Sequence, residues 1–253
     1  MNIKVLTLFP EFFDSFKQTS IIKRAIDTNL VNFQCINFRD YTKDKHHNVD
    51  DTICGGGAGM LLTCQPIVDA IKANRNNNSK VIMMSPQGTL LTQKKVQALA
   101  KNEDVIVLCG HYEGFDERIR NYVDEEISIG DYVLTGGESA AIVLCDAMIR
   151  LYDGVITTKS HEDDSFAAGL LEYPQYTRPI EFDNQKVPDV LLSGHHENIR
   201  KWRLKESIRK TYLRRPKLLE KKELSKEEQL LLNEVIQEEL DKNENKEDSS
   251  LAI

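Results

Sequence analysis

The chain has 253 residues, of which 40% are hydrophobic and 29% charged, so it is long and apolar enough to bury a sizeable core. This composition excludes collagen-like, low-complexity and disulfide-scaffold proteins. The five cysteines include no C-x-x-C pair, which indicates reduced thiols in a cytosolic compartment. The longest apolar stretch, Ala140 to Ile149, contains Asp146 and is too short to span a membrane. We therefore expect a soluble cytoplasmic protein without a membrane partner.

The first 151 residues predict alternating strands and helices. Alternating or continuous apolar residues favour a strand, and apolar residues at a spacing of three to four favour a helix. The predicted strands are residues 1–9, 31–38, 80–85 and 104–109, and the predicted helices are residues 20–30 with Ser20 as N-cap, 65–73, 92–101 and 138–151. Residues 42–60 are too polar and glycine-rich for either element. This alternation predicts an α/β fold with a parallel sheet.

The composition changes after residue 151. Residues 157–169 are polar and acidic, and helical patterns return at residues 197–213 and 225–240, followed by a tail that we expect to fray after Asp241. We therefore predict a domain of residues 1–160, an interdomain linker of residues 161–173 and a small helical domain of residues 174–253.

The net charge of −7 conceals a segregation of charge in this second half. Residues 200–222 contain eleven lysines and arginines against two glutamates, whereas residues 223–248 contain ten acidic residues against three lysines. A basic block of this density is a candidate surface for RNA phosphates. The alternative to RNA binding is a structural role for the basic block, because the acidic helix that follows could pack against it. We expect Trp202 and Tyr212 to belong to the core.

Glycine clusters lie at residues 55–59, 110–114 and 136–137. Glycine lets a backbone approach a ligand closely, although any one cluster also suits a tight turn. Neither a Walker nor a Rossmann glycine pattern is present, which disfavours a P-loop NTPase and an ordinary class I methyltransferase. Gly110 directly follows a predicted strand, and parallel sheets bind ligands at the carboxyl ends of their strands. We therefore expect the loops around Gly110, Gly130 and Gly136 to form one pocket.

No histidine has a neighbour at zinc-ligand spacing, so we expect no metal ligands in the protein. A cluster of carboxylates at residues 162–164 has two interpretations. It is either a solvated acidic linker or the source of a general base, because mutual repulsion makes one carboxylate a better proton acceptor.

Taken together, these stretches resemble the bacterial tRNA (guanine-N1)-methyltransferase family (TrmD), which belongs to the knotted SPOUT class. The resemblance runs from Thr7 to about Leu219 and departs from the family at Ile53-Cys54 and Ser139-Ala140. Its main motifs are Val49-Asp50-Asp51, Gly55-Gly56-Gly57-Ala58-Gly59-Met60, Ser85-Pro86-Gln87-Gly88, Gly110-His111-Tyr112-Glu113-Gly114, Ile129-Gly130-Asp131-Tyr132-Val133-Leu134, Asp164-Ser165-Phe166 and Trp202-Arg203.

The resemblance implies methyl transfer from S-adenosylmethionine to N1 of the guanine at tRNA position 37, next to the anticodon on its 3′ side. It also implies a deep trefoil knot, which is rare among folds, and a homodimer with the active site at the subunit interface. Mg²⁺ is expected to assist, with no protein ligands assigned to it.

The resemblance also implies roles for particular residues. Asp164 matches the catalytic aspartate because it precedes Ser165-Phe166, and Arg150 matches the active-site arginine. The implied cofactor-binding residues are Ser85, Pro86, Gln87, Gly110, Tyr112, Glu113, Ile129, Gly130, Asp131, Tyr132, Val133, Leu134, Gly136 and Gly137. From the basic block we expect RNA contacts by Arg200, Arg203, Arg209, Arg214 and Arg215.

This chemistry has physical requirements. N1 of neutral guanine carries a proton that a base must remove, and negative charge then develops at O6, where a guanidinium would stabilise it. Two alternatives remain open at this point. A ribose 2′-O-methyltransferase on the same scaffold would not need Asp164 for a ring proton, and a non-catalytic RNA-binding module would not need the three cofactor loops.

Overall fold

The computed structural model describes residues 1–156, 165–166 and 168–251, with side chains up to residue 242. The chain divides into two compact units, Met1–Thr158 and Lys159–Ile253. None of the described helices is both long and apolar enough to cross a membrane.

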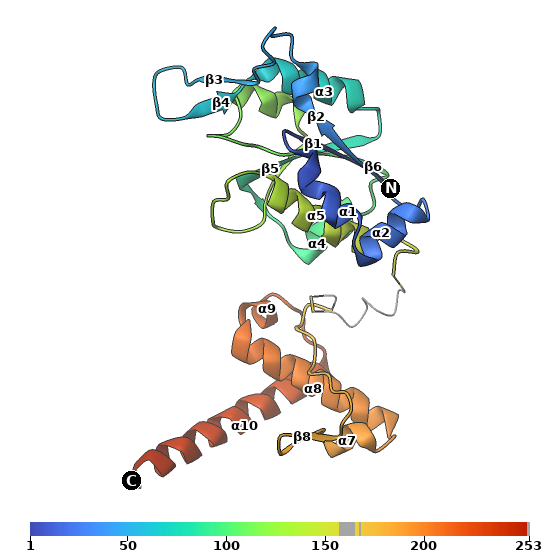
Figure 1. Ribbon diagram of the computed structural model, residues 1–253. Coiled ribbons are helices and arrows are strands. Elements are labelled where there is room, and N and C mark those ends of the chain that lie inside the picture. The colour runs from blue at the N-terminus through green and yellow to red at the C-terminus, as the bar shows by residue number, and fades with distance from the viewer. Residues whose placement is uncertain (157–164, 167, 252–253) are drawn as a thin grey trace. The chain divides into compact units, whose positions relative to one another are not determined.

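The first unit is built on a five-stranded parallel sheet, which confirms the predicted fold class (Figure 1). Its strands, in the spatial order β2-β1-β6-β5-β7, all pair in parallel. They are β1 (Asn2–Thr7), β2 (Asn32–Asn37), β5 (Ser79–Leu90), β6 (Asp104–Leu108) and β7 (Glu125–Ser128). The four predicted strands are all present. Strand β7 was not predicted, because its sequence, Glu-Glu-Ile-Ser, has no apolar run.

Helices cover both faces of this sheet. Successive side chains of a strand point to opposite faces, so Val105 and Val107 of β6 belong to one buried cluster and Ile106 and Leu108 to another. The first cluster includes side chains of α2 (Ser20–Asp27), α4 (Gln93–Leu99) and α5 (Glu138–Arg150), and the second includes those of α3 (Cys64–Asn74) and the 3₁₀ helices η2 (Phe38–Tyr41) and η3 (Glu117–Tyr122). Two short helices, η1 (Pro10–Phe13) and α1 (Asp14–Lys17), precede α2.

Two sequence-based expectations about this unit were wrong. The segment at residues 42–60, predicted to be irregular, contributes to a short antiparallel hairpin, β3 (Asp50–Thr52) and β4 (Met60–Leu62). The hairpin escaped prediction because its strands have three residues each and a glycine-rich loop separates them. Thr19 rather than Ser20 is the N-cap of α2, and its side chain makes no capping hydrogen bond.

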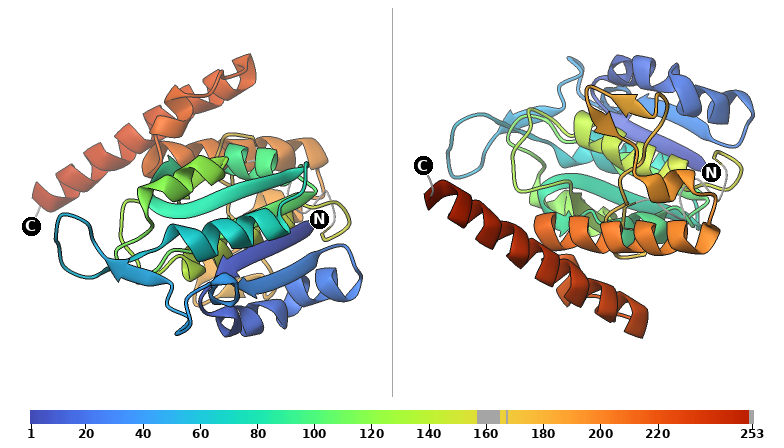
Figure 2. Two further views of the ribbon diagram at one scale, coloured as in Figure 1. Left: turned by 90° about the horizontal axis from the view of Figure 1, so that it is seen from above. Right: turned by 90° about the horizontal axis from the view of Figure 1, so that it is seen from below.

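The second unit contains α7 (Asp189–Leu192), α8 (His196–Arg214), α9 (Lys217–Glu220), α10 (Lys226–Leu251) and a hairpin of β8 (Glu181–Phe182) and β9 (Gln185–Lys186). Helices α8 and α10 pack against each other (Figure 2). Leu170 is buried with Ile208 and Val235, so this part of the expected linker packs within the second unit. Helix α10 continues to Leu251 where a frayed tail was predicted.

Candidate functional site

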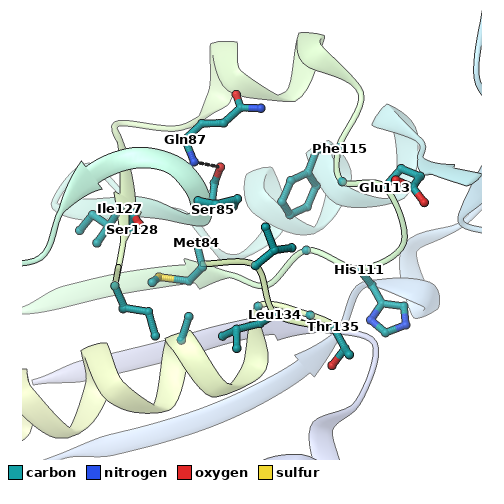
Figure 3. Close-up of a pocket in the computed structure, with 18 of the residues that line it drawn as sticks. Met84, Ser85, Gln87, His111, Glu113, Phe115, Ile127, Ser128, Leu134 and Thr135 are labelled. Carbon is teal, nitrogen blue, oxygen red and sulfur yellow. Dashed lines mark hydrogen bonds between the residues drawn. The ribbon is translucent and has the colours of Figure 1, made fainter. Parts of the chain in front are cut away.

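A pocket of about 310 Å³ lies in the first unit, at the carboxyl ends of three neighbouring strands (Figure 3). Its walls come from the irregular part of β5 that begins at Met84, from the segment after β6 and from the segment that joins β7 to α5. Cavities of this size hold small molecules, and the carboxyl ends of parallel strands are where α/β proteins bind them. The prediction that the loops around Gly110, Gly130 and Gly136 form one pocket is therefore confirmed.

The structure brings nearly all of the expected cofactor-binding residues to this pocket. Asp131 is the exception, because it does not line the cavity. The lining residues that were not among the expected cofactor-binding residues are Met84, His111, Gly114, Phe115, Glu117, Arg120, Ile127, Ser128, Thr135 and Ala140. Most of these lie in or beside the quoted motifs, so the sequence could have predicted them. Arg120 lies on η3, a helix that was not predicted.

The Ser85-Pro86-Gln87 stretch, expected in a loop, forms an irregular part of strand β5. The pairing register with β7 shifts between Met84 and Thr89, because both residues pair with Ile127. The residues between them form a bulge that projects toward the pocket, and Gln87 N–H donates to Ser85 Oγ at 3.1 Å within it (Figure 3). A bulge re-aims side chains at the edge of a sheet, and here it supplies one wall of the pocket.

Glycines let the other two walls lie close together. Gly137 N–H donates to Gly110 O at 2.8 Å, and a Cβ at Gly137 would lie 2.8 Å from both Cys109 Cα and Gly110 N. A Cβ at Gly110 would lie 2.8 Å from the ring of Phe115. In this structure these two glycines therefore allow close packing between segments of the chain itself.

Buried polar groups connect the pocket to strand β1. The Glu138 carboxylate, buried at the start of α5, accepts a hydrogen bond from Thr7 Oγ1 at 2.8 Å. His111 packs edge-on against Phe9 and Tyr112, and its Nδ1 is buried without a partner among the described residues. Burial, with Glu138 nearby, raises the pKa of the Cys109 thiol well above its ordinary value. Cys109 therefore stays protonated and unreactive.

Of the two expected catalytic residues, the structure describes Arg150 but not Asp164. Asp164, with the neighbouring acidic residues 162 and 163, lies outside the residues that the structure describes. Arg150 is the last residue of α5, and Ala140 near the start of that helix lines the pocket. Ten residues of helix span roughly 15 Å. Arg150 is therefore far along α5 from the pocket of its own chain and does not line it.

The basic block of the second unit is partly neutralised by α10, as the alternative interpretation held. Arg200 pairs with Glu227 at 2.6 Å, Lys205 with Glu234 and Glu238 at 2.8 Å, and Arg209 with Glu238 and Glu239. Two of the five arginines expected to contact RNA are thus engaged by carboxylates.

The other three arginines have no acidic partner among the described residues. Arg203 lies over the Tyr173 ring, 4.9 Å from its centroid, and Arg215 lies 5.8 Å from the centroid of Phe166. Arg214 is exposed. Tyr212 packs on the buried cluster around Ile208, which confirms its expected place in the core, while Trp202 is half-buried beside Tyr176.

A parallel sheet whose strand-end loops enclose a pocket defines an α/β protein with a cavity of the size that holds small molecules. The comparisons with known proteins name the family. The family model described as tRNA (Guanine-1)-methyltransferase TrmD matches residues 1–221. The chain belongs to the tRNA (guanine-N1)-methyltransferase family.

Curated relatives cover almost the whole chain. A tRNA (guanine-N(1)-)-methyltransferase of Bacillus cereus is 53% identical over 94% of this chain and 100% of its own length. The one from Spiroplasma kunkelii is 51% identical over 97% of this chain and 92% of its own, and one from Bacillus anthracis is 52% identical over 93% and 98%.

Proposed function

We propose that this protein transfers a methyl group from S-adenosylmethionine to N1 of the guanine at position 37 of tRNA. The observation that carries the proposal is the pocket: it gathers, from three separate segments, all but one of the residues expected to bind the cofactor. Membership of the family supports the reaction, because the relatives bear the name of that activity.

The residues of the pocket suit S-adenosylmethionine. Apolar side chains of Ile129 and Leu134 would contact its apolar parts, and the polar groups of Ser85 and Gln87 line the same cavity. The close approach of the walls at Gly110 and Gly137 gives the cavity its shape. When bound, the cofactor supplies the activated methyl group, and the protein supplies binding, orientation and a proton acceptor.

For the chemical step we assign Asp164 as the base that removes the N1 proton and Arg150 as the donor that stabilises charge at O6. Arg150 does not line the pocket of its own chain. Its place far along α5 supports a homodimer in which the arginine of one protomer serves the pocket of the other. Apolar residues exposed near the pocket, above all Val133 at 83%, support the same arrangement, because a partner would cover them.

We propose further that Arg203, Arg214 and Arg215 bind tRNA phosphates, so that the second unit is the tRNA-binding domain. The trefoil knot belongs to the proposal, supported by the convergence of the β5 bulge and of the segments after β6 and β7 on one pocket. A tRNA substrate places the reaction in the cytoplasm. Mg²⁺ is expected to assist the reaction, with no protein ligand assigned to it.

The decisive experiment is methyl transfer to an unmodified tRNA transcript, with the product nucleoside identified by mass spectrometry. We expect 1-methylguanosine at position 37, and no product when position 37 is not guanine. A ribose 2′-O-methyl product would instead establish the other reaction of this scaffold. RNA binding without transfer and without binding of S-adenosylmethionine would establish a non-catalytic module.

The assignment of Asp164 has an internal control one residue away. Asp164→Asn preserves size and removes basicity, and a positioned general base contributes ~10² to 10⁴ in rate. We expect single-turnover methyl transfer to fall by about that factor, with S-adenosylmethionine affinity nearly intact, whereas Asp163→Asn does little. Equal and small effects of the two substitutions would show that Asp164 is not the base.

A further inference from the structure

Arg120 joins three parts of the first unit at the rim of the pocket. It lies on η3 and lines the cavity with Gln87 and Glu117. Its Nη2 donates to Gln87 Oε1 at 2.9 Å, its Nε donates to Glu117 Oε2 at 2.9 Å, and its Nη1 pairs with Glu126 of β7. The guanidinium is planar and has donors on several sides, so it can make these contacts together.

The contact with Gln87 bears on the shape of the pocket. Gln87 lies in the bulge of β5, where the ladder with β7 is interrupted between Met84 and Thr89. Gly88 packs directly on the β7 backbone at Glu126 and Ile127. The bulge is thus fixed to β7 through its backbone at Gly88, and its side-chain anchor is the bond from Gln87 to Arg120.

The pairing with Glu126 fixes Arg120 in turn. Glu126 forms no other salt bridge among the described residues, and its Oε1 is buried without a hydrogen-bond partner there. A carboxylate in this position needs a cation, because an uncompensated charge away from water is costly. Glu126 thereby holds the guanidinium between β7 and the bulge.

We propose that Arg120 is a positioning residue for the cofactor: it holds Gln87, and with it the Ser85–Gly88 bulge, in the conformation that forms the pocket wall. This inference rests on the proposed function, since it takes the ligand of the pocket to be S-adenosylmethionine. Arg120 itself acts through Gln87 and not on the methyl group.

The test compares Arg120→Met and Arg120→Lys with Arg75→Met. Arg75 is a matched control because it also ties the start of β7 to a neighbouring element, through Asp124 at 2.7 Å, but does not line the pocket. For Arg120→Met we expect a rise of about tenfold in the KM for S-adenosylmethionine with kcat unchanged at saturation. Lysine keeps a positive charge beside Glu126 but lacks the planar guanidinium, whose donors reach Gln87 and Glu126 together. Compared with Arg120→Met, Arg120→Lys should therefore recover thermal stability but not the affinity for S-adenosylmethionine.

A second measurement uses the protein without ligand. Hydrogen exchange of the backbone amides of Ser85 and residues 87–90 should become faster in Arg120→Met and stay as in wild type in Arg75→Met. Wild-type exchange and wild-type KM in Arg120→Met would overturn the inference, as would an equal rise in KM for Arg75→Met. If the wild-type protein fails to bind S-adenosylmethionine, the proposed function fails, and the exchange rates still decide whether Arg120 holds the bulge.

Discussion

Gly110 and Gly137 meet at the end of β6, yet a side chain would encounter different neighbours at the two positions. At Gly137 the nearest atoms are backbone, Cys109 Cα and Gly110 N, which cannot move without shifting the strand end. At Gly110 the nearest atoms belong to the Phe115 ring, which can turn. The sequence shows two similar glycines, but their tolerance of substitution should differ.

We predict that Gly137→Ala lowers the free energy of unfolding by about 1–3 kcal/mol, the usual penalty for overpacking. Gly110→Ala should lower it less, because the Phe115 ring yields. Urea unfolding followed by circular dichroism measures both, with equal m-values as the check that the two variants unfold alike. A Gly110→Ala protein that loses as much stability as Gly137→Ala would contradict this difference.

A larger side chain at Gly110 should act on the pocket itself. Gly110→Val must displace Phe115, which lines the cavity, so we predict weaker binding of S-adenosylmethionine in a protein that stays folded. Calorimetric titration measures the change in affinity. The additional substitution Phe115→Ala removes the clash and should restore part of the affinity. Unchanged affinity in folded Gly110→Val would remove this segment from the binding site.

At the scale of elements, ion pairs join α8 to α10. Lys205 and Arg209 lower the pKa of Glu238, and Arg200 lowers the pKa of Glu227. These carboxylates bind protons less readily in the folded unit than in the unfolded chain. Their contribution to stability is therefore fully present above the ordinary glutamate value of 4.5 and is lost as the pH falls through the lowered pKa values.

We accordingly predict that acidification from pH 7 to pH 3 loosens α10 from α8. Amide protection in residues 226–242, corrected for the intrinsic rate, should decrease over this range while β1 and β6 of the first unit stay protected. Arg209→Met removes the cation that contacts both Glu238 and Glu239 and should flatten the pH dependence. Protection of α10 that is the same at both pH values would show that its apolar contacts alone hold it.

At the scale of the whole molecule, the protein combines an acidic total charge with a local basic surface. The net charge is −7, and α10 neutralises part of α8. Among the described residues, the cations of this block without a carboxylate partner, and therefore left for a polyanion, are Arg203, Lys210, Arg214, Arg215, Lys217 and Lys221. The structure thus divides the basic block of residues 200–222 into cations that carboxylates hold and cations that remain available to bind RNA.

We predict that the double variant Arg214→Ala, Arg215→Ala weakens tRNA binding and lowers the logarithmic salt slope by roughly 0.7 to 0.9 for each phosphate that is no longer neutralised. Affinity for S-adenosylmethionine should not change. Filter binding of tRNA across a salt series gives the slope. Arg200→Ala is the comparison, because its guanidinium is held by Glu197 and Glu227 and should add little to the slope. A wild-type slope in the double variant would place the tRNA surface elsewhere.

The sequence by itself determined four of the five strands of the sheet, most of the pocket and the family. Strand β6 and helix α5 are visible in the sequence because an apolar run or a helical period is a property of neighbouring residues. The pocket was predictable for a related reason: Gly110 follows a strand, and parallel strands bring their carboxyl ends to one edge. The motifs for the family are likewise continuous stretches.

Only the tertiary structure decided which distant residues meet. Strand β7 forms from Glu-Glu-Ile-Ser because it pairs with β5, and no local sequence pattern predicts this strand. The bond from Arg120 to Gln87 joins residues 33 positions apart, and the pairs of α8 with α10 join residues about 30 apart. Such contacts depend on strand register and helix packing, which are set by the whole core. Local propensity therefore determined most of the helices and strands, and their packing determined β7 and the partners of the charged side chains.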